Sequence, residues 1–83
     1  MKLSVFNAIG QNLATLDVDG NNVKIVSDEK WFSGLNGKEM ELRIRIKGKN
    51  TIGDAKKVVK PGEKDYFDAV VDTIELMGFE IKP

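Results

Sequence analysis

The chain has 83 residues, carries no net charge, and contains neither cysteine nor histidine. Without cysteine it has no disulfide and no thiolate metal ligand, and without histidine it lacks the commonest metal ligand and the usual proton shuttle at neutral pH. A composition of 41% hydrophobic and 31% charged residues is typical of a folded domain rather than a disordered segment. We therefore expect one small globular domain over residues 1–83, with no metal and no cofactor.

Membrane and export signals are also missing from the sequence. It contains no apolar stretch near the ~20 residues that a membrane-spanning helix requires, and its N-terminal residues lack the pattern of a signal peptide. These absences, together with the lack of cysteine, predict a cytoplasmic protein with no membrane partner.

The charges are unevenly distributed along the chain. Residues 43–64 contain eight lysines and arginines and two acids, a net charge of +6. Residues 65–83 contain one lysine and five acids, a net charge of −4, and residues 1–42 contain four lysines and six acids. The chain therefore has a basic middle and an acidic C-terminal end.

The first third of the chain has the pattern of three short strands. Residues 2–9 carry apolar side chains on both faces, which favours a central strand or one covered on both sides. Residues 13–18 alternate, and the residues of 19–22 tolerate the positive φ angles of a tight hairpin turn, so residues 23–27 are expected to return as the third strand. The simplest interpretation is a three-stranded antiparallel meander.

The middle of the chain begins with a loop over residues 28–37, which has room for one helical turn. Residues 38–47 then show the clearest alternation in the sequence, with apolar residues at 40, 42, 44 and 46 and charged residues between them. Residues 55–60 fit either a strand or a turn of helix, and we favour a strand because of Val58 and Val59.

The strongest helical pattern covers residues 63–77. Its apolar stripe recurs at spacings of three and four residues and consists of Phe67, Val70, Val71, Ile74 and Met77. Gly78 is placed to end the helix in a left-handed conformation, followed by Phe79 as in a Schellman motif, and residues 79–82 are expected to form a short final strand. A second, narrower seam contains Tyr66, Ala69, Thr73 and Leu76.

These elements predict an α+β fold. We expect an antiparallel, meander-like sheet of four to six strands, with one long C-terminal amphipathic helix packed across one face and a short final strand. Because such a helix needs an apolar surface to cover, the sheet and the helix should share a single core.

The residues do not form a pattern typical of an enzyme. No spacing pairs a nucleophile with a base, and no glycine-rich loop is suited to holding a phosphate. Residues 17–28 resemble a calcium loop only faintly, because the glycine falls at the fourth rather than the sixth position. We therefore predict a protein without catalytic activity, with no catalytic residues and no metal ligands.

The leading functional hypothesis is a non-catalytic protein-interaction module that binds another protein or a second copy of itself. Trp31 and Phe32 lie in the predicted loop, and Leu76 lies beside the apolar stripe of the helix. If they are exposed, these three side chains would mark a surface for a partner. The alternative for Trp31 is that it folds over an open sheet edge as part of the core.

The alternative function is nucleic-acid binding. The candidate residues follow the amphipathic strand and the segment after it, and they are Arg43, Arg45, Lys47, Lys49, Lys56 and Lys57. Cations along one strand face can follow a phosphate backbone, but sheet-face binders usually add aromatic residues for stacking, and this segment has none. A solvated edge strand that resists aggregation explains the same charges.

Overall fold

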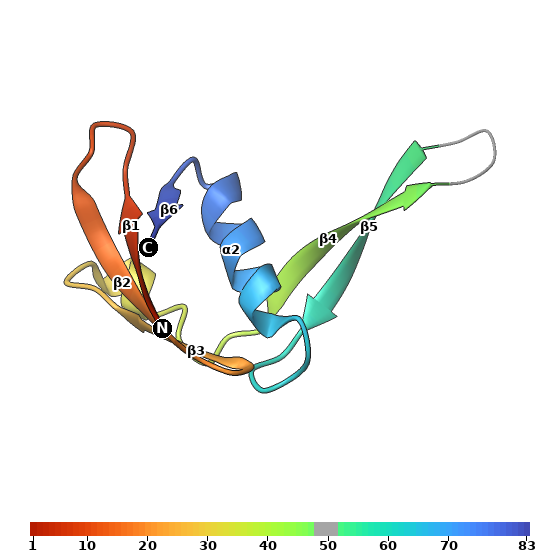
Figure 1. The fold of residues 1–83 in the computed structure, drawn as a ribbon, viewed down its shortest axis with the longest axis horizontal. Coiled ribbons are helices and arrows are strands. Elements are labelled where there is room, and N and C mark those ends of the chain that lie inside the picture. The colour runs from red at the N-terminus through yellow and green to blue at the C-terminus, as the bar shows by residue number, and fades with distance from the viewer. Residues whose placement is uncertain (48–51) are drawn as a thin grey trace.

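The computed structural model describes residues 1–47 and 52–83 and has an α+β fold (Figure 1). In chain order the elements are β1 (Lys2–Phe6), β2 (Asn12–Asp19), β3 (Asn22–Val26), α1 (Lys30–Ser33), β4 (Met40–Lys47), β5 (Ile52–Val59), α2 (Tyr66–Leu76) and β6 (Glu80–Lys82). The α+β class and the preference for a strand after residue 54 are confirmed.

A four-stranded antiparallel sheet forms the larger part of the fold, in the order β3-β2-β1-β6. The meander of the first three strands is confirmed, and β1 is central, as its two apolar faces predicted. Along β2 the alternation also holds, because Ala14, Leu16 and Val18 are buried while Asp17 is exposed. Ala14, Leu16 and Val18 therefore lie on the same face of the sheet, and this face contributes to the core.

Strand β1 ends at Phe6, three residues earlier than predicted. The Asn7 side-chain oxygen accepts hydrogen bonds from the backbone N–H groups of Ile9 (3.1 Å) and Gln11 (2.9 Å). This local turn competes with strand pairing, so the chain reverses at once and leaves Ile9 79% exposed.

The prediction that the strands form one sheet is wrong. Strands β4 and β5 pair with each other in a separate two-stranded sheet, from Met40 opposite Val59 to Lys47 opposite Ile52. Figure 1 shows this two-stranded ribbon projecting away from the rest of the fold. Its base is anchored in the core by Met40 and Val59, which are both buried.

The helix α2 has 11 residues and begins at Tyr66, so it is shorter than the long helix predicted from residue 63. Glu63 instead accepts a hydrogen bond from the Lys60 N–H group at 2.7 Å, and Asp65 has a φ angle of +72°. A residue with positive φ cannot belong to a right-handed helix, so the first helical residue follows it.

The end of α2 is as predicted. Gly78 has a φ angle of +89°, its N–H group donates to the Glu75 carbonyl at 3.0 Å, and the Phe79 N–H group donates to the Ile74 carbonyl at 3.4 Å. These two bonds are those of a Schellman motif, in which glycine takes the left-handed position because it has no side chain.

The buried face of α2 is rotated relative to the predicted stripe. Tyr66 and Ala69 are buried together with Val70 and Ile74, whereas Phe67 and Val71 of the predicted stripe are only partly buried. Met77, the last residue of that stripe, is exposed at the end of the helix. The rotation arises because α2 packs against two neighbours, lying between the four-stranded sheet and β4 (Figure 1). The second seam therefore faces protein rather than solvent at Tyr66 and Ala69.

The core is continuous across the helix, the sheet and the loop between them. Phe32 of α1, Leu16 of β2 and Tyr66 of α2 are among its largest fully buried side chains. In the described residues, no helix has both the length and the apolar character needed to cross a membrane.

Candidate functional site

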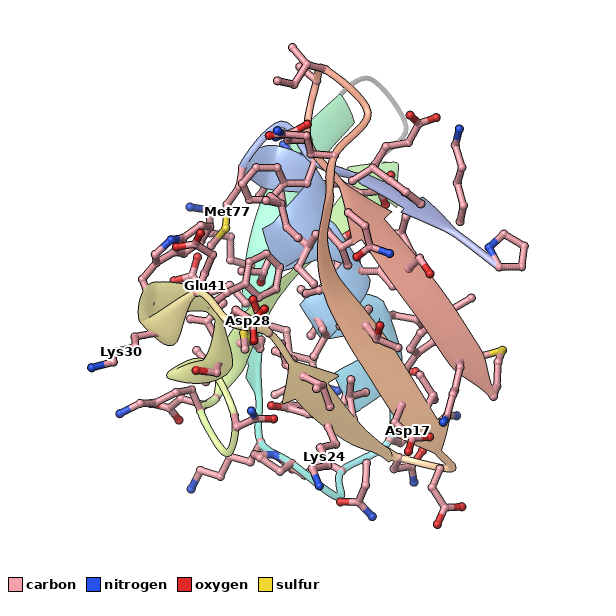
Figure 2. The ribbon with its side chains drawn as sticks, turned by 90° about the vertical axis from the view of Figure 1, so that its left-hand side faces the viewer. Asp17, Lys24, Asp28, Lys30, Glu41 and Met77 are labelled. Atoms are coloured by element: carbon pink, nitrogen blue, oxygen red, sulfur yellow. The ribbon has the colours of Figure 1, made fainter. Side chains whose placement is uncertain are left out.

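An apolar groove of about 430 Å³ lies between the C-terminal end of α2 and the first half of β4. Its apolar lining consists of Leu35, Met40, Leu76 and Met77. Its polar lining consists of Lys38, Glu39, Glu41, Arg43, Lys56 and Thr73. Glu41 and Met77 are labelled in Figure 2.

The exposed apolar residues of the groove come from the last turn of α2. Ile74 is fully buried, and at 100° per residue Leu76 lies on the far side of the helix from it. Leu76 is 58% exposed and Met77 is 43% exposed, although both are large and apolar. The loop after α1 places the half-buried Leu35 on the same groove.

Trp31 and Phe32, which are adjacent in the sequence, have different environments. Phe32 is 0% exposed and belongs to the core. The partner hypothesis required an exposed side chain, so it does not apply to Phe32. Trp31 is 51% exposed, and its ring lies 5.9 Å from the ring of Phe79 and 5.0 Å from that of Phe32. One part of the indole therefore covers the core and the other part faces solvent.

Leu76 is exposed, as the partner hypothesis requires, and two further apolar residues, Leu35 and Met77, line the same groove. The predicted stripe includes Met77 among the buried residues, and Leu35 lies within the predicted loop of residues 28–37. Periodicity gives no signal for Met77, because at 100° per residue it lies about 20° from the buried Tyr66 and Val70. Met77 is exposed at the C-cap position, where the helix ends.

The charged rim of the groove is mixed in sign. Lys56 Nζ lies 3.5 Å from Glu41 Oε2, and both side chains are largely exposed, so this ion pair contributes little to stability. Beside it, the Arg43 backbone N–H group donates to Asp72 Oδ2 at 3.1 Å, which ties β4 to α2. Asp72 of α2 therefore contacts the basic strand β4 through the backbone of that strand and not through a basic side chain.

The proposed nucleic-acid residues do not share one surface. Arg43 and Lys56 are opposite each other on the two strands and so point to the same face of the ribbon. Lys57 pairs with Leu42 and points to the other face. Lys49 and the side chains of Arg45 and Lys47 lie outside the described part of the chain.

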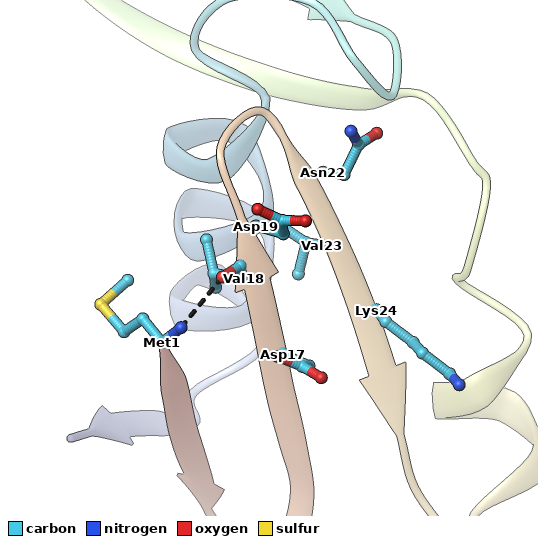
Figure 3. A pocket seen from close by; sticks show the side chains of 7 residues that line it. All are labelled: Met1, Asp17, Val18, Asp19, Asn22, Val23 and Lys24. Carbon is cyan, nitrogen blue, oxygen red and sulfur yellow. Dashed lines mark hydrogen bonds between the residues drawn. The ribbon is translucent and has the colours of Figure 1, made fainter.

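A second pocket of about 410 Å³ lies at the end of β2 and β3 that is closed by their hairpin turn, and Figure 3 shows its lining. The Met1 amino group donates to the Val18 carbonyl at 3.1 Å. Met1 and Lys24 point away from each other (Figure 3), so the polar groups do not converge on one point. We assign no function to this pocket.

The described residues contain no cluster of three carboxylates that could hold a metal ion. Burial raises the pKa of Tyr66 above its ordinary value, and the Tyr66 hydroxyl group donates to the Lys38 carbonyl at 2.6 Å. This contact is part of the packing between α2 and the start of β4.

Comparison of the chain with protein-family models, with curated protein sequences and with solved structures finds no match.

Proposed function

We propose that the chain is a small non-catalytic protein-interaction module whose binding surface is the groove between α2 and β4. The observation that carries this proposal is the exposure of Leu76 and Met77 beside Leu35 at the end of a helix whose other apolar residues are largely buried. The partner we propose is another protein that inserts an aliphatic or aromatic side chain between these residues.

The form of the groove favours a protein over a small-molecule ligand. Small-molecule sites combine an apolar lining with a few inward-pointing polar groups that fix the ligand's orientation. Here Lys38, Glu41 and Lys56 are exposed at the rim, and their mixed signs suit the polar margin of a protein interface. The half-exposed indole of Trp31 does not line the groove, but its ring lies 5.9 Å from that of Phe79, two residues after Met77. It offers a partner an aromatic side chain of the kind that dominates binding energies at such interfaces.

The test starts with a photo-crosslinking amino acid placed at position 76, followed by purification of the captured protein. The affinity of that purified protein is then measured for the natural chain and for Leu76→Glu. A charge buried in an apolar contact without a partner costs several kcal/mol, so we expect the dissociation constant of Leu76→Glu to rise by about 100-fold or more.

Ile9→Glu provides the control, because Ile9 is more exposed than Leu76 and lies in the turn between β1 and β2. Its affinity should equal that of the natural chain. Equal affinity for Leu76→Glu would contradict the proposal. An apparent affinity that depends on the concentration of the module itself would identify a second copy of the chain as the partner.

Nucleic-acid binding remains the second candidate because Arg43 and Lys56 lie side by side on one face of the ribbon. The ion pair between Lys56 and Glu41, the position of Lys57 on the other face and the lack of aromatic residues in the ribbon give it less support. Its test is a titration with single- and double-stranded oligonucleotides at low and high salt. If the chain binds the phosphate backbone, its affinity for the oligonucleotides should fall steeply as the salt concentration rises. An absence of binding at low salt would exclude nucleic-acid binding.

A further inference from the structure

Most of the strand edges in this fold are blocked, each by a different structural feature. The outer edge of β3 is engaged at Ile25, whose N–H and C=O groups bond to the side-chain amide of Asn36 at 2.7 and 2.6 Å. Strand β6 has only three residues. Along β4, the helix α2 covers the edge through the bond between Asp72 and the Arg43 N–H group. Such features prevent other chains from adding to a sheet.

Strand β5 has an outer edge without such a block in the described residues. In an antiparallel pair, residues alternate between those that bond to the partner strand and those whose N–H and C=O groups point away from it. Because the Arg43 N–H group bonds to α2, Arg43 and its partner Lys56 are of the second kind. The backbone groups of Lys56, and of Val58 two residues later, therefore point to the open side of β5.

The side chains along this edge determine which strand it would accept. Lys56, Lys57 and Lys60 are exposed beside the exposed Val58. If β5 paired antiparallel with β5 of a second copy about this segment, lysines would lie opposite lysines, which is unfavourable. A strand with acidic side chains would instead place opposite charges across the pair.

We propose that the outer edge of β5 between Lys56 and Val58 is a strand-addition site for an extended acidic segment of a protein partner. Main-chain hydrogen bonds to Lys56 and Val58 supply the affinity, and the three lysines select the charge of the added strand. The side chain of Lys56 also lies at the rim of the groove, but the site proposed here consists of backbone groups on the outer side of β5. The amides of Leu76 and Met77, which line the groove, therefore distinguish binding at β5 from the function proposed above.

The test uses a capped peptide of about nine alternating glutamate and valine residues, long enough to pair along a strand of ordinary length. Amide hydrogen exchange and chemical shifts of the full chain are followed by NMR during the titration. We expect the amides of Lys56 and Val58 to become protected, while those of Leu76 and Met77 remain unchanged. The proposal would be overturned if the amides of Lys56 and Val58 gained no protection from exchange at millimolar concentrations of the peptide.

Two matched comparisons separate strand addition from charge attraction. A peptide with N-methyl groups on the amides that face β5 has the same charge but cannot form the hydrogen bonds, so its affinity should fall by about tenfold or more. Lys56→Pro removes the outward donor and should have a similar effect, whereas Lys56→Ala retains the donor and should lose less. Equal binding of the methylated peptide, or of a lysine–valine peptide, would overturn the proposal.

Discussion

Tyr66 is the largest fully buried side chain in the described part of the fold, and its hydroxyl group is bonded to the Lys38 carbonyl. The contact joins the first residue of α2 to the segment that enters β4. Tyr66→Phe keeps the ring and removes the donor, so we expect a loss of about 1 kcal/mol in the free energy of unfolding at neutral pH. Urea denaturation monitored by fluorescence of Trp31 measures this loss.

The same residue gives the fold a pH dependence. Burial raises the pKa of Tyr66 in the folded state, so between the ordinary pKa of about 10 and the folded value only the unfolded chain releases the proton. Its contribution to stability is therefore complete below about pH 10 and is lost as pH rises above it.

The stability of Tyr66→Phe supplies the reference for that prediction, because both chains contain the same lysines. The difference in unfolding free energy between the natural chain and Tyr66→Phe should be constant from pH 7 to about pH 9 and should fall above about pH 10. A difference that rises above pH 10 would contradict the account of Tyr66.

Asn36 takes the place of a neighbouring strand beside β3. Its side-chain amide accepts from and donates to the backbone of Ile25, and both bonds are partly buried. Asn36→Ala leaves both backbone groups without these partners, and we expect a loss of about 1–3 kcal/mol in the free energy of unfolding. The control is Asn12→Ala, at an exposed position, which should change stability by less than about 0.5 kcal/mol. Equal effects of the two substitutions, measured by urea denaturation, would exclude this role.

At the scale of the elements, the two ends of α2 differ in how well the sequence predicts them. The C-terminal end follows from Gly78 alone, because few other residues adopt its φ angle. The N-terminal end does not, since the acids at 63 and 65 match a first helical turn but are used in the preceding turn instead. Acidic residues near a helix start determine the position of that end less strictly than a residue that must adopt a positive φ angle determines the other end.

Gly78→Ala tests the end of α2. The substitution requires a residue with a side chain to adopt a φ angle of +89°, which we expect to lower the free energy of unfolding by about 1 kcal/mol. Gly53→Ala in β5 is the matched control, because Gly53 does not have a positive φ angle and an added Cβ would have nothing within 4 Å. In thermal unfolding, Gly78→Ala should have a lower midpoint temperature than Gly53→Ala. A lower midpoint for Gly53→Ala would refute the prediction.

The ribbon of β4 and β5 should open more easily than the four-stranded sheet. Two strands alone are marginally stable in water, and among the described side chains of the ribbon it is Met40, Leu42 and Val59, near its base, that reach the core. Native-state hydrogen exchange should show the amides of Ile44 and Ala55 exchanging at least 10-fold faster than those of Val5 and Leu16. Equal rates would mean that the ribbon and the sheet unfold as one unit.

For the whole molecule, the sequence predicts individual strands and helices better than it predicts how they are arranged in space. Alternation along residues 13–18 and 38–47 identifies β2 and β4, but alternation does not say which strands become neighbours. The separation of β4 and β5 from the larger sheet depends on α2 lying along the edge of β4, which is a long-range contact.

The candidate site shows the same limit. Leu76 could be selected from the sequence because it falls outside the apolar stripe. Phe32 and Trp31 could not be distinguished, because the four residues of α1 are too few to show a helical periodicity. Leu35 and Met77 become part of the groove only once the loop after α1 and the end of α2 lie against β4. A groove built from three segments leaves no signature in any one of them.

An amide and indole NMR map of the chain, recorded with the purified protein captured at position 76, tests whether the groove between α2 and β4 binds a partner. We predict that the largest shifts fall on Leu35, Leu76, Met77 and the indole of Trp31, with little change at Ile9. Shifts that leave the groove unperturbed and fall elsewhere on the surface would show that the groove between α2 and β4 is not the binding surface.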